Sequence, residues 1–265
     1  MKVFISADIE GIAATTRWEE INSSESTYTI CAKRMTEEVV AACEGAIAAG
    51  AKEIWVKDAH SRGTNLDVSM LPEEVTVVRG WEGHPYMMVQ GLDSSFDAVM
   101  FVGYHSEAGS TGNPLCHTMS TEPQHVLLNG KPCSEFMIYS FCAAYEHVPT
   151  VFLSGDRALC EASKALYPWL TTVAVKEGRG RSTVAMVPKK ACRLIREGVE
   201  AALSQDLSGM KYELPDYFKA EIEYKENQTA AAMSYFPGVE RVDSHTICFE
   251  EKDWFEAARK LKFLL

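Results

Sequence analysis

The sequence lacks most of the features that would direct a protein to nucleic acid or to a membrane. Its 265 residues contain no basic block, and the formal net charge is −11. Because nucleic acid and anionic membrane surfaces both bind clusters of lysine and arginine, neither is expected as a partner. No apolar run is long enough to cross a bilayer. The first residues also lack the apolar core and the cleavage site of a signal peptide.

Cysteine is present, but its spacing predicts neither disulfides nor a structural zinc site. The eight cysteines are scattered along the chain, and no Cys-x-x-Cys pair occurs. Several lie in apolar helical patterns, where a reduced thiol behaves as a small hydrophobic side chain. We therefore expect free thiols and a reducing, cytoplasmic location.

Short apolar runs alternate with helical patterns, within an ordinary content of 46% hydrophobic and 24% charged residues. This alternation is typical of an α/β sheet that helices cover on both faces. Strands are predicted over residues 3–8, 53–58, 75–78, 98–104, 150–153 and 171–175. Helices are predicted over residues 134–145 and 189–203; a further long helix ends near residue 49, and another begins after residue 156. Asn129-Gly130 predicts a β-hairpin within residues 124–133.

A soft domain boundary is predicted between residues 204 and 218, which are polar and include Gly209 and Pro215. We expect a three-layer α/β/α catalytic domain with a largely parallel or mixed sheet over residues 1–205. A smaller α+β lobe over 206–265 either follows as a separate unit or is integrated into the same domain. Its predicted elements are strands over 220–224 and 246–250 and helices over 227–233 and 253–264.

Carboxylates and imidazoles collect at the ends of three predicted strands. Asp8 and Glu10 follow the first strand, His60 follows the second, and His105 follows the fourth. Ligands of open α/β sheets bind beyond the carboxyl ends of the strands, so these side chains are expected to converge on one crevice. Such ligands, without a thiolate pair, favour a divalent metal in a hydrolytic site. Asp and His after strands also act as caps and turn formers, so the residues alone leave both interpretations open.

Several short motifs are similar in order and spacing to those of one enzyme family. They are residues 6–11 (SADIEG), 58–61 (DAHS), 103–105 (GYH), 116–119 (CHTM), 129–130 (NG) with Glu135 behind them, and 173–176 (VAVK) followed by Arg181. Together they resemble the zinc-dependent D-aminopeptidases, whose founding member belongs to a bacterial dipeptide-transport operon. The similarity extends from residue 1 to at least residue 188 and continues weakly to the C-terminus.

The resemblance implies a centre of two Zn²⁺ ions, with other divalent metals as alternatives. Asp8 aligns with the carboxylate that bridges both ions in the family. Glu10 and His60 align with the remaining ligands of one ion, and His105 and Glu135 align with those of the other. Two ions bridged in this way share a hydroxide and stabilise the charge that develops on the scissile carbonyl.

The resemblance also implies a catalytic role for His117, which aligns with a histidine that is not a metal ligand. Imidazole titrates near neutral pH, so this residue is expected to move a proton or to stabilise the tetrahedral intermediate. Arg181 is a candidate for holding a substrate carboxylate or for a subunit interface. Ser134, Arg157 and Cys116 stand where relatives commonly have glycine, aspartate and serine, and these departures bear on substrate preference rather than on reaction type.

The remaining histidines match no ligand position and are interpreted as surface or capping residues. They are His84, His125, His147 and His245. The Gly-Arg-Gly-Arg run at residues 178–181 is a weak signal for phosphate binding.

The predicted function is a metal-dependent aminopeptidase that acts on short peptides, with a small D residue such as D-alanine at the N-terminus. By the same resemblance we expect a ring-like homo-oligomer, to which apolar residues near the C-terminus, such as Phe255, Phe263 and Leu264, are candidate contributors. The alternatives are a two-metal amidohydrolase for a cell-wall or γ-linked peptide, a non-catalytic peptide-binding protein and, more distantly, a phosphoesterase. A histidine at position 117 argues against a pure binding protein, which has no need of a proton shuttle.

Overall fold

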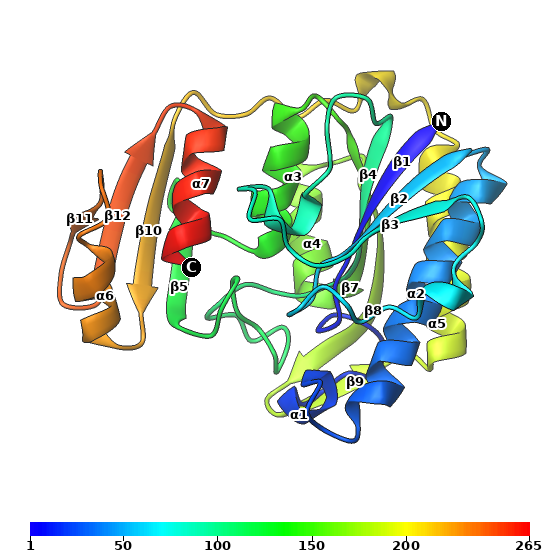
Figure 1. The fold of residues 1–265 in the computed structure, drawn as a ribbon, viewed down its shortest axis with the longest axis horizontal. Helices are drawn as coiled ribbons and strands as arrows, with labels where there is room; N and C mark the ends of the chain where they lie inside the picture. Colours follow the sequence, from blue (N-terminus) through cyan, green and yellow to red (C-terminus); the bar gives the residue numbers. More distant parts are fainter.

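A seven-stranded sheet organises the larger part of the computed structural model, which describes residues 1–265 (Figure 1). Its strands are β1 (Lys2–Ala7), β2 (Glu53–Asp58), β3 (Val75–Val78), β4 (Ala98–Tyr104), β7 (Thr150–Asp156), β8 (Thr171–Arg179) and β9 (Ser182–Ala185). Their order across the sheet is β3-β2-β1-β4-β7-β8-β9, and only the β8–β9 pair is antiparallel. Strand β9 was not predicted, because its residues lie at the sheet edge and are mostly exposed, so they carry little apolar pattern.

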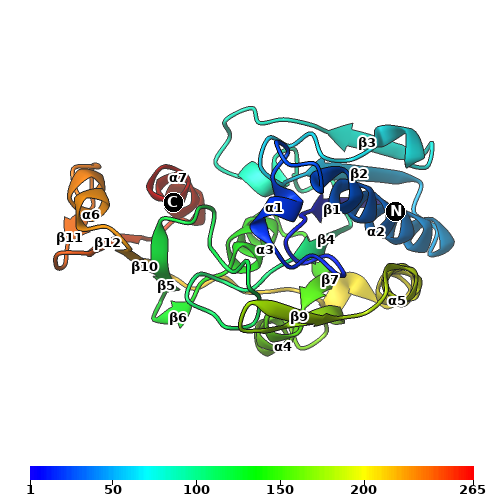
Figure 2. The ribbon, with the colours of Figure 1, turned by 90° about the horizontal axis from the view of Figure 1, so that it is seen from below.

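Helices cover both faces of this sheet. Helices α2 (Tyr28–Ala48) and α5 (Pro188–Leu203) pack on one face, and α3 (Glu135–Tyr145) and α4 (Arg157–Leu166) pack on the other (Figure 2). Alternate residues of β1 show the division, because Val3 and Ile5 lie in the core with α2 and α5 whereas Phe4 lies in the core with α3. The predicted three-layer α/β/α arrangement is confirmed. None of the helices combines the length and the apolar character needed to span a membrane.

A second, five-stranded sheet lies beside the first (Figure 1). Its strands, in the order β11-β12-β10-β5-β6, are β5 (Pro123–Leu128), β6 (Lys131–Pro132), β10 (Phe218–Tyr224), β11 (Glu240–Arg241) and β12 (Thr246–Glu251). The predicted hairpin joins β5 to β6 through Asn129 and Gly130, both with positive φ. The division of the chain at residue 205 stays a prediction, and this sheet combines strands from both sides of it.

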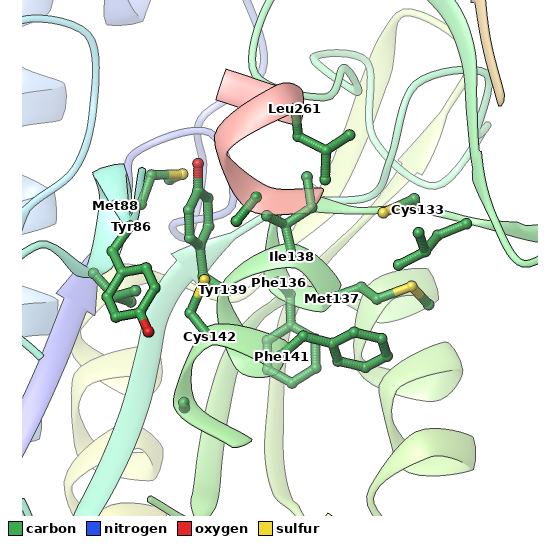
Figure 3. Close-up of a cluster of buried hydrophobic side chains, with 14 of the residues drawn as sticks. Tyr86, Met88, Cys133, Phe136, Met137, Ile138, Tyr139, Phe141, Cys142 and Leu261 are labelled. Carbon is green, nitrogen blue, oxygen red and sulfur yellow. The ribbon is translucent and has the colours of Figure 1, made fainter. Parts of the chain in front are cut away.

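The second sheet packs with α6 (Asn227–Met233) and α7 (Trp254–Leu264). Helix α7 also contacts α3, so that α3 has apolar partners on both sides. Figure 3 shows Phe136, Tyr139 and Phe141 of α3 in this core, with Leu261 of α7 above them. The remaining elements are short: α1 (Trp18–Ile21), η1 (Val68–Met70), η2 (Met87–Val89) and η3 (Leu207–Gly209).

The strand order reverses between β1 and β4. From β1 the chain proceeds to β2 and β3 on one side, and later from β4 to β7 and β8 on the other. The connections leave this point in opposite directions, which opens a crevice beyond the carboxyl ends of the two strands. The residues that follow β1 and β4 therefore lie at the mouth of the crevice.

Three glycines allow the backbone to pack closely at this crevice. A Cβ atom at Gly11 or Gly155 would lie 1.8 or 2.1 Å from the carbonyl oxygen of Tyr104. One at Gly103 would lie 2.3 Å from the carbonyl oxygen of Asp8, and Gly103 also has a φ of +74°. Residues with side chains are excluded from these positions by contact with backbone, which cannot move aside as a flexible side chain can.

We expect Gly103→Ala to lower the free energy of unfolding by about 3 kcal/mol or more, because it combines a strained backbone with a clash against Asp8. Gly180→Ala is the matched control, since Gly180 also has positive φ but faces open space. It is expected to cost only about 1 kcal/mol. Urea unfolding of both variants measures the difference, and equal losses would show that the close packing at Gly103 contributes nothing.

Candidate metal centre

The structure brings the five predicted ligands together from four segments of the chain. Asp8 and Glu10 follow β1, His60 follows β2, His105 follows β4, and Glu135 is the first residue of α3. All five are at least nine-tenths buried. In the sheet register Ala7 pairs with both Asp58 and Val102, which aligns the ends of the three strands. The parallel sheet thus places four of these side chains, and the N-terminus of α3 adds the fifth.

One group of possible ligands consists of Asp8, Glu10 and His60. The Nδ1 atom of His60 lies 3.5 Å from Oδ1 of Asp8 and 3.1 Å from Oε2 of Glu10. Its Nε2 atom lies 3.2 Å from the carbonyl oxygen of Ile21. Because a carbonyl only accepts hydrogen bonds, Nε2 carries the proton, and the neutral ring directs the Nδ1 lone pair at the two carboxylates.

A second group consists of Asp8, His105 and Glu135. The Nε2 atom of His105 lies 3.6 Å from Oδ2 of Asp8 and 3.4 Å from Oε2 of Glu135. Its Nδ1 atom donates to the carbonyl oxygen of Ser106 at 2.9 Å, so the lone pair of the neutral ring is on Nε2. Asp8 therefore offers one oxygen to each group, as a bridging carboxylate does.

The unsatisfied polar atoms of the centre fit divalent cations. Oδ2 of Asp8, Oε2 of Glu10 and Nε2 of His105 are buried and have no hydrogen-bond partner. In each group the ligand atoms of the three residues lie within 4.8 Å of one another. With neutral imidazoles these atoms are all acceptors, and acceptors that face one another are satisfied by a cation between them. Carboxylate oxygen and imidazole nitrogen are ligands that zinc accepts.

The electrostatics of the protein alone indicate the same need for positive charge. Burial raises the pKa of Asp8 well above its usual value, and the nearby Glu10 carboxylate raises it further. Burial alone would lower the pKa of His60, but the nearby carboxylates of Glu10 and Asp8 outweigh burial and raise it well above normal. Burial would also lower the pKa of His105, and Glu135 reverses that effect. Without metal the cluster retains protons, and bound cations can replace them.

His117 lies next to this centre. Its ring stacks on that of His105, with centroids 4.3 Å apart and an interplanar angle of 15°. Its Nδ1 atom donates to the carbonyl oxygen of Leu115 at 2.9 Å, and Nε2 lies 3.5 Å from Oε1 of Glu135. His117 also forms a group with Glu10 and His105 in which the ligand atoms are within 4.8 Å, so its position is compatible with either proton transfer or metal binding.

A pocket of about 510 Å³ opens over the centre. Asp8, Glu10, His60, Glu135 and His117 all line it, and seven of its sixteen lining residues are hydrophobic. This volume lies within the range of small-molecule sites in proteins. The pocket therefore provides room for a small substrate in contact with the candidate ligands.

Residues behind the centre hold its backbone in place, and the sequence did not identify most of them. The Nζ atom of Lys176 donates to the carbonyl oxygens of Glu10 and Thr15. Asp156 accepts from the backbone nitrogen and the hydroxyl of Ser106, at 2.7 and 2.5 Å. Asp156 also caps α4 by accepting a hydrogen bond from the backbone nitrogen of Leu159. These contacts fix the two segments that carry Glu10 and His105.

Asp58 supports the third segment. Its carboxylate accepts from the backbone nitrogens of Asn65 and Leu66, at 2.5 and 2.8 Å, and from the Asn65 side chain at 2.7 Å. The same Asn65 amide donates to the carbonyl oxygen of His60 at 2.7 Å. These hydrogen bonds give Asp58 a supporting position behind His60.

The other residues that the sequence singled out do not line the pocket. Arg181 is exposed at the turn between β8 and β9. Ser134 caps α3 by accepting a hydrogen bond from the backbone nitrogen of Met137. Arg157 pairs with Glu177 at 3.0 Å, and the thiol of Cys116 donates to the carbonyl oxygen of Ser110. None of the four remaining histidines, His84, His125, His147 and His245, lines the pocket.

Three comparisons relate the chain to known proteins. The sequence profile of peptidase family M55, described as D-aminopeptidase, matches residues 1–263. A D-aminopeptidase of Bacillus subtilis (strain 168) is 32% identical over 259 residues, which cover 97% of this chain and 94% of the relative. A solved structure, the Zn-dependent D-aminopeptidase DppA from Bacillus subtilis, described as a self-compartmentalizing protease, superposes with a TM-score of 0.92 at 30% identity. This match covers 100% of this chain and 96% of that one.

The match covers both sheets and extends beyond the motifs from which the resemblance was first drawn. The predicted family relationship is therefore confirmed. The chain belongs to the M55 family of D-aminopeptidases.

Proposed function

We propose that this protein is a dinuclear zinc aminopeptidase that removes an N-terminal D residue from short peptides. The observation that carries the proposal is the position of Asp8, whose two oxygens face two separate groups of buried ligands. The family relationship and the zinc dependence of the Bacillus subtilis structure support zinc and aminopeptidase chemistry. Asp8, Glu10 and His60 would hold one ion, and Asp8, His105 and Glu135 the other.

Zinc at these ligands would supply Lewis acidity toward the scissile carbonyl and would lower the pKa of a bound water. The protein supplies the orientation of the ligands. The carbonyl oxygens of Ile21 and Ser106 fix the proton on Nε2 of His60 and on Nδ1 of His105. Each imidazole therefore directs its other nitrogen at the centre before any ion binds, which lowers the cost of reorganisation.

We assign proton transfer to His117. The hydrogen bond from its Nδ1 atom to Leu115 leaves the Nε2 lone pair of the neutral ring free to accept a proton. Stacking on His105 and contact with Trp18, at a centroid distance of 5.5 Å, hold the ring at the pocket wall. An imidazole in this position can take a proton from the attacking water and donate it to the leaving amine.

Discrimination between D and L residues follows from how an aminopeptidase holds its substrate, and the family relationship favours the D form. The terminal amine and the scissile carbonyl are both fixed, which leaves two directions at the α-carbon for the side chain and the hydrogen. Inversion of the α-carbon exchanges these two directions. A pocket that is closed in one of them therefore rejects one enantiomer by steric clash.

We also propose that the chain assembles into a ring-like homo-oligomer, as the description of the Bacillus subtilis structure as self-compartmentalizing suggests. Among the C-terminal residues that were candidates for contact, Phe263 is 55% exposed, whereas Leu264 is buried in the core. Tyr235, on the segment after α6, is 88% exposed. A cytoplasmic location remains a prediction.

Metal analysis of purified variants tests the shared ligand. Asp8→Ala is expected to lose both ions, because it removes an oxygen from each group, whereas Glu135→Ala is expected to weaken mainly one. Asp67→Ala, at an exposed turn, is the control and should retain both ions. A wild-type enzyme that is fully active with one ion per chain would exclude the bridged centre.

His117→Ala is expected to keep its fold and its zinc and to lose about 10²–10⁴-fold in kcat, the usual contribution of a general acid or base. Circular dichroism and metal content are measured together with kcat. Loss of zinc in this variant would instead identify His117 as a ligand, which its distance to Glu10 and His105 also permits.

Hydrolysis of D-Ala-Ala is expected to exceed that of L-Ala-Ala by at least about tenfold in kcat/KM, because a steric clash discriminates more strongly than the loss of a methylene group. Steady-state assays of the zinc-loaded enzyme with both peptides measure this ratio. Equal rates or an L preference would overturn the stereochemical assignment. Activity only on γ-linked or cell-wall peptides would favour the alternative amidohydrolase.

A further inference from the structure

The two parts of the pocket lining adjoin different ligands. The end beside Glu135 is formed by His117, Met119, Ser120 and Thr121, and the backbone nitrogen of Met119 donates to Oε1 of Glu135 at 2.7 Å. The end beside His60 is formed by Ala59, Ser61, Trp81, Met87 and Met88, which come from the segment after β2 and from the residues around η2. The first end is mainly polar and carries the proposed proton carrier, and the second is largely apolar.

The position of His117 assigns the two ends to the two parts of the substrate. Because it donates a proton to the leaving amine, the departing part of the peptide lies at the end formed by residues 117–121. The N-terminal residue then lies on the opposite side, towards His60, and its side chain is directed at the apolar end. This assignment rests on the proposed aminopeptidase activity.

Trp81 is held at that apolar end by two contacts. Its indole nitrogen donates to the carbonyl oxygen of Ser61, directly after His60, at 2.7 Å. The Nζ atom of Lys57 lies 3.9 Å from the indole centroid. Lys57 is fully buried and is fixed by hydrogen bonds to the carbonyl oxygens of Asp58 and Gly80, at 2.6 and 2.7 Å.

These contacts hold the indole at its edge and on one face. Trp81 is 37% exposed and lines the pocket with the surface that Lys57 leaves free. The neighbouring Met87 has a flexible, unbranched side chain that can change conformation to fit a ligand, whereas Met88 is buried in the core. A planar ring fixed by a hydrogen bond and a buried cation cannot move aside at comparable cost. The accessible rigid part of the apolar end is therefore Trp81.

We propose that Trp81 determines the size of the side chain that the enzyme accepts at the N-terminal residue of its substrate. The class of substrate assigned to this end is a peptide with a small apolar N-terminal residue. Larger apolar side chains are excluded by the indole, and charged side chains find no partner among Ala59, Met87 and Met88.

The test compares kcat/KM of wild type, Trp81→Phe and Trp81→Ala on D-Ala-Ala, D-Leu-Ala and D-Ala-Leu. Trp81→Ala is expected to raise the ratio of D-Leu-Ala to D-Ala-Ala by about tenfold or more, which is the discrimination that a few methylene groups provide. Trp81→Phe should lie between wild type and Trp81→Ala, because it keeps an aromatic wall of smaller size. The ratio of D-Ala-Leu to D-Ala-Ala should not change, since the second residue lies at the other end.

Trp18→Ala is the matched control. Trp18 lines the same pocket, but its ring contacts His117 rather than the apolar end. Its loss is expected to lower kcat/KM for all three peptides by a similar factor. Zinc content and melting temperature are measured for every variant, because Trp81 also contacts the backbone next to His60, and the ratios are compared only among variants that retain zinc.

Several outcomes would overturn the assignment. If the wild-type enzyme hydrolyses D-Leu-Ala and D-Ala-Ala with equal kcat/KM, it does not select by side-chain size, and Trp81 cannot determine such a selection. Ratios that stay constant in both Trp81 variants, or that shift equally for the first and the second residue, also contradict it. If zinc-loaded wild type hydrolyses none of the peptides, the proposed function fails, which this comparison distinguishes from a failure of the specificity assignment.

Discussion

The burial of three carboxylates in one small space is the constraint on which the rest of the site depends. Asp8, Glu10 and Glu135 are each nearly inaccessible to water, and like charges at this spacing are stable only beside positive charge. The imidazoles of His60 and His105 supply part of this positive charge. Their hydrogen bonds to backbone carbonyls direct the other ring nitrogens at the carboxylates. The arrangement is costly without cations and is complete with them, so folding energy and metal affinity are coupled.

The backbone segments that carry the carboxylates also pack closely against one another. Gly11 and Gly103 let the segments after β1 and β4 approach to hydrogen-bonding distance, with the Gly11 nitrogen 2.8 Å from the Gly103 carbonyl oxygen. Lys176 and Asp156 then fix these segments from behind. Because a shift of about one ångström weakens catalysis strongly, this rigid support is part of the chemistry.

The sequence predicted the parts of the site that follow from strand periodicity. Asp8, Glu10, His60 and His105 were placed together because the carboxyl ends of parallel strands meet at one edge of a sheet, and the observed register aligns those ends. Glu135 was assigned only through the family resemblance, since it begins a helix after a hairpin and no local pattern connects it to the strands. The support from Lys176 and the fixing of Trp81 by Lys57 depend on contacts between distant segments, which periodicity does not reveal. For the same reason the pairing of the 123–132 hairpin with strands near the C-terminus was not predicted.

The second sheet pairs strands that are distant in the sequence, which affects folding during synthesis on the ribosome. Asn129, at the turn after β5, bonds to Tyr217, 88 residues further along the chain. At ordinary translation rates these residues emerge roughly 4 to 18 seconds apart. During that interval β5 has an open edge, and the apolar side of α3 stays uncovered until α7, which follows β10 and β12 in the chain, has been made. The nascent chain therefore exposes an unpaired strand and an uncovered core next to Glu135, the features that chaperones bind and that promote aggregation.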